Sequence, residues 1–208
     1  MCKNTPTMMP DCIYQIFNRG INSEALFKHP DNYSFFLEKL TFYLSPVAEL
    51  YAYCLMKEHF HLCLKTLSED AIRANLQLDQ LPHNKVEHSC SWHISNQFAS
   101  IFKSYAQSIN KAFRRTGGLF QEPFRRMQLP PDADLRWLIA YVHLNPKLHG
   151  FLPHFPAYSY SSYSDLLAAG PTKLNRDMVL STFGSRKEFA TFHRQKIPID
   201  ILQSMSMD

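Results

Sequence analysis

Two histidines separated by one bulky apolar residue, His59-Phe60-His61, constrain this 208-residue chain more than any other feature. They follow a largely apolar run, 50–56, and a polar pair, Lys57-Glu58. This pattern predicts two antiparallel strands joined by a tight turn. Successive side chains of a strand point to opposite faces, so His59 and His61 share one face and Phe60 enters the core. Two neutral imidazoles on one face can hold a divalent metal, although an isolated His-x-His pair also occurs without a ligand.

A second segment, Leu135 to Pro146, also carries reactive side chains. Its apolar residues recur at i, i+3, i+4 and i+7, which predicts a helix lying on a core. Pro146 is expected to end this helix, because the residue before a proline disfavours helical geometry. Tyr141 and Asn145 are four residues apart and share a side, about 90° from the centre of the apolar stripe. We expect both at the edge of the core, where a phenol and an amide oxygen can point into a site. Taken alone, the same pattern describes an ordinary amphipathic helix.

The other periodicities predict the remaining elements of one domain. They are a strand at 13–17, a helix at 31–44, strands at 50–56 and 59–65, a polar irregular stretch at 68–90 with a short helix at 69–76, a long helix at 92–113 and a short strand at 124–129. This order predicts an α+β fold, a ferredoxin-like antiparallel sheet with helices on one face. We expect residues 1–150 to form the main domain, which carries both of these segments. Residues 151–208 are expected to form a helical C-terminal extension, with two or three short helices between 162 and 195 and a flexible tail.

Composition narrows the class of protein further. A hydrophobic content of 45% describes a folded globular chain, and no apolar run approaches the length of a membrane span. The first ten residues contain one lysine and no apolar segment, so no secretory signal is expected. Five cysteines without a close Cys-x-x-Cys pair suit a reducing cytoplasm and predict no disulfide framework. A net charge of +4 permits binding to nucleic acid without establishing it.

Several passages together resemble the single-tyrosine HUH transposases, and in particular the REP-associated tyrosine transposases. The resemblance covers roughly residues 12 to 195. The passages are Tyr14-Gln15-Ile16-Phe17-Asn18-Arg19-Gly20, residues 53–62, Gly118-Leu119-Phe120-Gln121 with Phe124-Arg125, Tyr141-Val142-His143-Leu144-Asn145-Pro146, and Tyr160-Ser161-Ser162-Tyr163. Glu122-Pro123 interrupts a stretch that is usually more basic in this family.

The resemblance implies a metal-dependent enzyme that nicks and rejoins single-stranded DNA, beside a hairpin. Tyr141 is then the nucleophile and forms a 5′-phosphotyrosine. His59, His61 and the side-chain oxygen of Asn145 hold Mg²⁺ or Mn²⁺. The tyrosine helix reaches the second, open face of the sheet, from the same subunit or from a partner. The resemblance also implies a homodimer, and exposed sheet edges favour such pairing. A domesticated copy acting on hairpin repeats would carry the same residues.

Basic side chains are expected to bind the DNA backbone, with aromatic rings available for base stacking. The candidates are Arg19, Lys103, Lys111, Arg114, Arg115, Arg125 and Arg126. Cys63 shares the strand face of the histidines and is expected to pack beneath the site. His143 is expected to be structural or to face DNA.

Two other function classes fit the same residues. A ferredoxin-like sheet can bind single strands without cutting them, so a catalytically silent single-stranded nucleic-acid-binding protein is one alternative. A metal-dependent hydrolase that uses water in place of Tyr141 is the other. Binding alone requires neither the histidine pair nor the tyrosine, so the enzyme is favoured.

Overall fold

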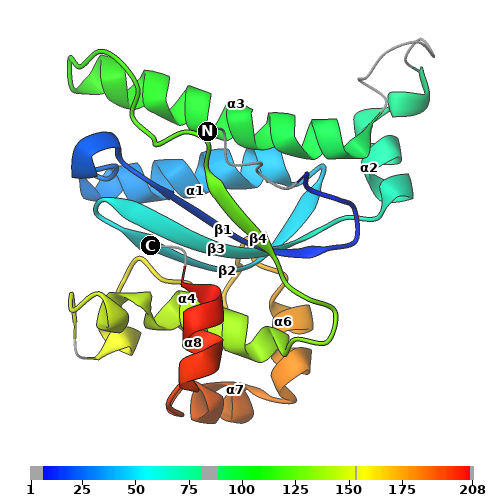
Figure 1. Cartoon of the computed structure of the whole chain (residues 1–208), viewed down its shortest axis with the longest axis vertical. Coiled ribbons are helices and arrows are strands. Elements are labelled where there is room, and N and C mark those ends of the chain that lie inside the picture. The colour runs from blue at the N-terminus through cyan, green and yellow to red at the C-terminus, as the bar shows by residue number, and fades with distance from the viewer. Residues whose placement is uncertain (1–6, 81–88, 153, 207–208) are drawn as a thin grey trace.

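The protein is built around a four-stranded antiparallel sheet in the order β2-β3-β1-β4, as the computed structural model shows (Figure 1). The model describes residues 7–80, 89–152 and 154–206. The strands are β1 (Ile13–Arg19), β2 (Ala48–Met56), β3 (His59–Thr66) and β4 (Arg125–Gln128). This confirms the predicted α+β class and its ferredoxin-like sheet. Part of the predicted irregular stretch, residues 81–88, lies outside the described residues, as do residues 207–208 of the expected tail.

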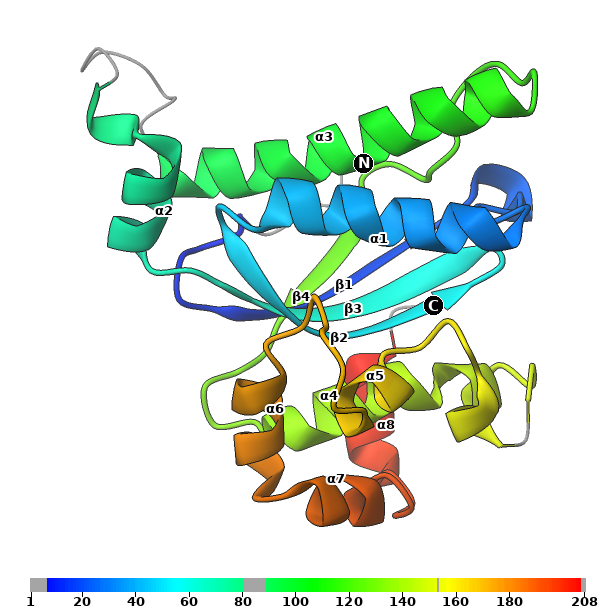
Figure 2. The same ribbon diagram turned by 180° about the vertical axis from the view of Figure 1, so that it is seen from behind.

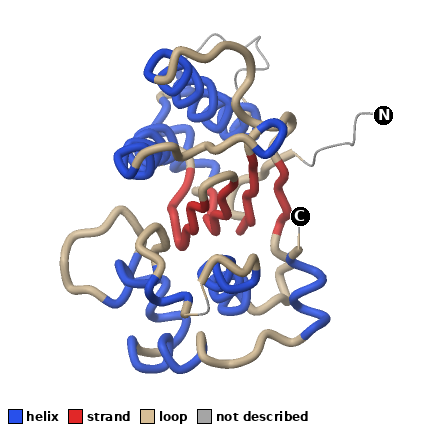
Figure 3. Tube along the Cα trace, turned by 90° about the vertical axis from the view of Figure 1, so that its left-hand side faces the viewer, coloured by secondary structure: helices blue, strands red, loops and turns tan. Residues whose placement is uncertain are grey.

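Helices form a layer on each side of this sheet (Figures 1 and 3). The first layer contains α1 (Pro30–Leu44) and α3 (Cys90–Ala112), with α2 (Glu69–Leu76) beside it. The second layer contains α4 (Leu135–Leu148), α5 (Tyr163–Leu167), α6 (Arg176–Phe183), α7 (Arg186–Phe192) and α8 (Ile199–Met205). Short 3-10 helices cover Ile21–Ser23, Leu78–Gln80 and Phe155–Ala157. No helix among the described residues is long and apolar enough to span a bilayer.

The first layer receives the alternate side chains of β3. The ring of Phe60 lies 5.0 Å from that of Phe36 on α1 and 6.0 Å from that of Phe102 on α3, measured between centroids. The buried side chains of α3, which include Ile94, Phe98 and Ile101, recur at helical spacing. The predicted alternation along the histidine strand is therefore confirmed, because Phe60 enters this layer and the histidines face the other.

The prediction that the histidine face is open was wrong. Helix α4 packs on β2 and β3, and every residue from Leu138 to Pro146 is buried. Tyr141 is 2% exposed and Asn145 is fully buried, so neither occupies the predicted edge of the core. The reason is that the Tyr141 side of α4 packs on the histidine strand, while other sides of α4 contact α6 and α8 of the C-terminal extension. A single apolar stripe predicts packing against one structural element, whereas α4 packs against both the sheet and the C-terminal extension.

The C-terminal extension also closes the edge of the sheet at β2. The backbone N–H of Leu55 donates to the carbonyl of Tyr160 at 2.9 Å, and that of Ser162 donates to Tyr53 at 3.0 Å. Farther along the strand, the N–H of Asn175 donates to the carbonyl of Leu50 at 3.0 Å, where the loop before α6 rises to the sheet (Figure 2). These bonds occupy backbone groups that an edge strand otherwise offers to another chain.

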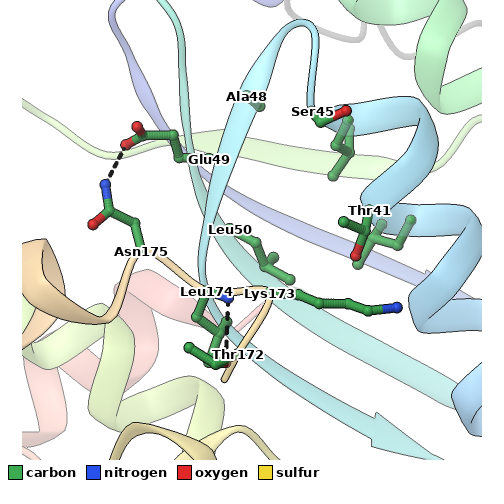
Figure 4. Close-up of a pocket in the computed structure, with 11 residues that line it drawn as sticks. Thr41, Ser45, Ala48, Glu49, Leu50, Thr172, Lys173, Leu174 and Asn175 are labelled. Atoms are coloured by element: carbon green, nitrogen blue, oxygen red, sulfur yellow. Dashed lines mark hydrogen bonds between the residues drawn. The ribbon is translucent and has the colours of Figure 1, made fainter. Parts of the chain in front are cut away.

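A groove of about 290 Å³ remains beside this closed edge (Figure 4). It lies between the end of α1, the start of β2 and the loop before α6, where Asn175 donates a hydrogen bond to Glu49 at 2.9 Å. Lys173 extends across it toward the helix that carries Thr41 (Figure 4). The histidine pair and Tyr141 do not line this groove, so it is separate from the candidate site.

A buried chain of hydrogen bonds joins α4 to the extension and explains His143. Its Nδ1 lies 2.8 Å from Nε2 of His193, and its Nε2 lies 2.7 Å from Oγ of Ser162. His193 Nδ1 lies 2.8 Å from the carbonyl oxygen of Phe189, so this nitrogen is the donor. His193 Nε2 then accepts from His143, and His143 Nε2 accepts from Ser162, which leaves both rings neutral. His143 is therefore structural, one of the two roles expected for it, and does not face DNA.

This buried pair predicts that the fold loses stability in acid. Burial lowers the pKa of His193 to about 4, whereas an unfolded histidine has a pKa of about 6.5. Between about pH 7 and pH 4 the unfolded chain therefore binds a proton at His193 that the folded chain does not bind. The free energy of unfolding falls as the pH drops through this range. We expect a loss on the order of 3 kcal/mol from His193, measured by urea unfolding at several pH values.

The variant His193→Gln is expected to show a shallower pH dependence than the wild type. His154→Gln serves as the control, because His154 is exposed. Equal slopes in the wild type and His193→Gln would refute the assignment of acid sensitivity to this residue.

Candidate metal and nucleophile site

The turn before the first histidine is fixed by the loop after β1. The N–H of Gly20 donates to the carbonyl of Glu58 at 2.8 Å, and that of Leu26 donates to the carbonyl of Lys57 at 2.8 Å. A Cβ atom on Gly20 would lie 2.0 Å from the carbonyl oxygen of Glu24, which no side chain tolerates. Steric crowding therefore explains the glycine of the Asn-Arg-Gly sequence. Only a residue without a side chain lets this loop bind the hairpin that carries the histidines.

His59 and His61 project from one face of β3, as predicted, and both are buried. Their ring centroids lie 5.6 Å apart. Phe17 of β1 is directly opposite His61 in the sheet, and its ring lies 4.9 Å from that of His61. The imidazoles are thus fixed by strand register and by packing against an aromatic ring. Two imidazoles fixed in this way suit the predicted role of a metal-ligand pair.

Tyr141 of α4 meets the histidine pair within the same chain. Its ring lies 5.8 Å from that of His61 in an edge-on arrangement, measured between centroids. Helix α4 also packs on the strand that carries His61. The structure thus brings the predicted nucleophile and one predicted metal ligand together without a partner subunit.

Asn145 lies one turn after Tyr141 and presents an unmatched oxygen. Its Nδ2 donates to the carbonyl of Tyr141 at 2.8 Å, which fixes the amide plane. Its Oδ1 is buried and accepts no hydrogen bond from the described residues. An unsatisfied buried acceptor costs roughly 1–3 kcal/mol unless another group supplies a partner. A divalent cation is such a partner, so this atom suits the predicted role of ligand.

The structure adds His149, which the sequence analysis missed. Helix α4 continues beyond Pro146 to Leu148, so the predicted end of the helix was wrong, and His149 caps it. Ligand nitrogens of His59, His61 and His149 all lie within 4.8 Å of one another. The missed signal is the repeated spacing of four from Tyr141 through Asn145 to His149, which places all three on one side of the helix.

These residues fit a divalent cation. Imidazole nitrogens and an amide oxygen form a mixed donor set that Mn²⁺ accepts, and Mg²⁺ accepts it when phosphate oxygens complete the shell. Cys63 is buried, as expected for a residue beneath the site. Burial raises the pKa of its thiol far above the ordinary value, which opposes the thiolate needed for a metal ligand.

The predicted DNA-binding side chains fall into two groups. Arg19 is opposite His59 in the sheet, and Arg125 is opposite Phe17, so both share the face of the histidines. Arg125 also lies over the ring of Phe17, at 5.7 Å from its centroid. These two arginines are therefore cross-strand neighbours of the residues of the candidate site.

The other five lie away from it. Lys103, Lys111 and Arg114 are exposed on α3 or just beyond its end, in the opposite helical layer. Arg115 pairs with Glu24 and donates to the carbonyl of Gly118 at 2.9 Å, which ties two loops together. Arg126 lies over the ring of Phe124 at 4.9 Å, and burial lowers its pKa.

Fold and site together define the class: a ferredoxin-like α+β protein in which a tyrosine helix lies across a His-x-His strand. The chain is similar in fold to a solved structure described as "Structure of the REP associates tyrosine transposase bound to a REP hairpin". The TM-score is 0.59 at 15% identity, and the match covers 82% of this chain and 87% of that one. No protein-family model and no curated protein matches the sequence. The predicted resemblance to the REP-associated tyrosine transposases is confirmed at the level of the fold.

The burial of His61 changes the expected outcome of its removal. A residue on an open face could be truncated without a cavity, whereas His61 is fully buried. We expect His61→Ala to lower the free energy of unfolding by about 1–3 kcal/mol in the absence of metal, because truncation of a buried ring leaves a cavity. We also expect Mn²⁺ to raise the melting temperature of the wild type and not that of this variant. The measurement is thermal unfolding with and without Mn²⁺.

The exposed His154 again supplies the control, as His154→Ala. If His61→Ala keeps the full Mn²⁺-dependent rise in melting temperature, His61 is not a ligand of the metal site.

Proposed function

We propose that this protein is a metal-dependent enzyme that nicks and rejoins single-stranded DNA, with Tyr141 as nucleophile and His59, His61 and Asn145 as metal ligands. The observation that carries the proposal is the 5.8 Å separation between the rings of Tyr141 and His61 within one chain. The similarity in fold to a tyrosine transposase bound to a REP hairpin supports it. A hairpin with single-stranded flanks is accordingly the proposed substrate, either in transposition or in a domesticated role.

The chemistry follows from a phenol held beside a cation site. A bound Mg²⁺ or Mn²⁺ would polarise the scissile phosphate and stabilise the charge that develops on it. The Tyr141 oxygen attacks phosphorus, and the bond between phosphorus and the 3′ oxygen breaks. The proton lost by the phenol is matched by the proton that the 3′ oxygen gains. The products are a 5′-phosphotyrosine and a free 3′-hydroxyl. One phosphodiester replaces another, so rejoining requires no ATP.

The exposed C-terminal end of α4 is the proposed place where the DNA strand enters the site. Leu148 and Phe151 are 45% and 47% exposed, and the ring of Phe151 lies 6.5 Å from that of His59. An exposed aromatic ring beside a phosphate site suits an unpaired base, which can stack on it. Arg19 and Arg125 are proposed backbone contacts on the same sheet face. Lys103, Lys111, Arg114, Arg115 and Arg126 would act on more distant parts of the DNA.

The assembly and location of the protein complete this proposal. We propose a homodimer in the cytoplasm, with residues 1–150 as the catalytic domain and residues 151–208 as its extension. The extension occupies part of the β2 edge, so sheet pairing between copies would use β4. Because His61 and Tyr141 meet within one chain, we propose that Tyr141 acts in cis.

Removing the Tyr141 hydroxyl is the direct test of the chemistry. We expect Tyr141→Phe to abolish covalent attachment to a labelled single strand in Mn²⁺ while keeping its affinity for DNA within about twofold, because the packed ring is retained. Denaturing gels detect the adduct and the cut strand. Tyr43→Phe, on α1 in the opposite layer, is the matched control and should keep full activity.

The same gels separate the alternatives. Cutting without an adduct would identify a hydrolase that uses water. Binding with neither cut nor adduct in the wild type would identify a catalytically silent single-stranded nucleic-acid-binding protein.

The proposed entrance predicts a preference for single strands. A flexible strand can bend its phosphate toward the recessed site, whereas a duplex holds its backbone farther away. In competition binding at fixed salt, a hairpin with single-stranded flanks should outcompete the same sequence fully paired. Phe151→Ala should weaken binding to the flanked hairpin by about 1–3 kcal/mol, the usual contribution of one stacked base.

The control variant is Phe42→Ala, which removes a phenylalanine that is 72% exposed on α1. Tighter binding to the duplex, or an equal loss in both variants, would contradict the proposed entrance.

A further inference from the structure

We propose that His149 is a third imidazole ligand of the metal site, so that the site prefers Mn²⁺, Co²⁺ or Zn²⁺ to Mg²⁺. The inference rests on the metal site of the proposed function and is independent of the DNA chemistry. It changes the donor set from two imidazoles and an amide oxygen to three imidazoles and an amide oxygen. Ligand number and type decide which cation a site selects.

The positions of the three rings support a shared ion. The ring centroid of His149 lies 4.7 Å from that of His59 and 6.2 Å from that of His61. One ligand nitrogen from each lies within 4.8 Å of the others. Metal–nitrogen bonds of about 2.0–2.1 Å at tetrahedral angles, as for zinc, place the nitrogens on one ion about 3.4 Å apart. The separations between the three nitrogens must therefore shorten by up to about 1.4 Å, which rotation of the exposed His149 side chain can supply.

The backbone at His149 is fixed by the end of α4. Its N–H donates to the carbonyl of Asn145 at 2.9 Å, which ties it to the turn that carries the amide ligand. The following Gly150 has a φ of +71°, and the N–H of Phe151 returns to the carbonyl of Pro146 at 2.8 Å. His149 is therefore held at a defined position rather than on a long loop, while its side chain remains exposed enough to adjust.

The helix terminus adds an electrostatic reason. The last carbonyl groups of an α-helix carry a partial negative charge, which stabilises a cation near the C-terminus. His149 occupies this terminus, and Asn145 lies in the turn before it. A divalent ion bound between His149 and the β3 histidines would lie close to these carbonyl groups. The anion of a DNA backbone would meet the unfavourable sign of the same dipole, so the metal is the better partner for this residue.

The chemistry of the donors sets the selectivity. Mg²⁺ prefers oxygen ligands and keeps several waters, so a third nitrogen adds little to its affinity. Imidazole suits Zn²⁺ and the other late divalent ions, and affinity at nitrogen sites rises from Mn²⁺ to Co²⁺. Losing His149 should therefore weaken Co²⁺ and Mn²⁺ binding much more than Mg²⁺ binding.

The test uses the metal-free full chain without DNA. Calorimetric titrations with Co²⁺, Mn²⁺ and Mg²⁺ are compared for the wild type, His149→Ala, His149→Gln and the exposed control His154→Ala. The visible absorption of bound Co²⁺ reports its ligands independently. We expect both His149 variants to bind Co²⁺ and Mn²⁺ at least about tenfold more weakly and to change the Co²⁺ spectrum. Mg²⁺ affinity should change less than about threefold, and the control should match the wild type.

Each other outcome has a defined meaning. Unchanged Co²⁺ affinity and spectrum in both variants would overturn the role of His149, and the metal site of the proposed function would stand if His59→Ala still abolished binding. In a separate DNA-binding measurement on the same variants, a loss of DNA affinity without a loss of metal affinity would make His149 a DNA contact and overturn the inference. A wild type that binds none of the three cations would overturn both this inference and the metal dependence proposed above, whereas formation of a Tyr141 adduct remains a separate measurement.

Discussion

The contact between α4 and the histidine face of the sheet is the interaction on which the second layer of this protein depends. It buries the apolar residues of α4, and it also places Tyr141 beside His61 and leaves the Oδ1 of Asn145 inside the protein. The free energy of burying apolar surface, about 25 cal/mol per Å², drives this packing. The same packing positions polar groups that would otherwise remain in water. Fold and candidate site therefore have one physical cause.

The C-terminal extension strengthens this contact from the opposite side. Through Ser162 and His193, the buried side chain of His143 ties α4 both to the covered edge of β2 and to the helix before His193. The Tyr160-Ser161-Ser162-Tyr163 sequence belongs to this junction, since its backbone pairs with β2. Its resemblance to a family motif therefore has a structural explanation: the segment fixes the helix that carries the tyrosine.

The parts predicted from the sequence are those that local periodicity determines. Alternation in β3 placed Phe60 and the histidines on opposite faces, and helical spacing located α1, α3 and the start of α4. The errors came from contacts between residues far apart in the chain. Tyr141 is buried where α4 packs on the histidine strand, and helices that begin after residue 160 contact α4 as well. No pattern within α4 predicts these contacts. The proline rule failed because Pro146 removes one hydrogen bond but does not prevent two further helical residues, so the position of His149 at the end of the helix was missed.

Burial of the candidate site has a consequence for how it can work. An amide oxygen in a core, such as the Oδ1 of Asn145, lowers stability unless it finds a partner, and the buried imidazoles of His59 and His61 add to the polar character of the core. A bound ion would supply the partner that the Oδ1 of Asn145 does not find among the described residues. The exposed neighbours His149 and Phe151 lie at one end of α4, which is the end that we propose an ion or a phosphate would approach. Tyr141, the proposed nucleophile, is thus enclosed on most sides, and the proposed preference for a flexible single strand over a rigid duplex rests on this enclosure.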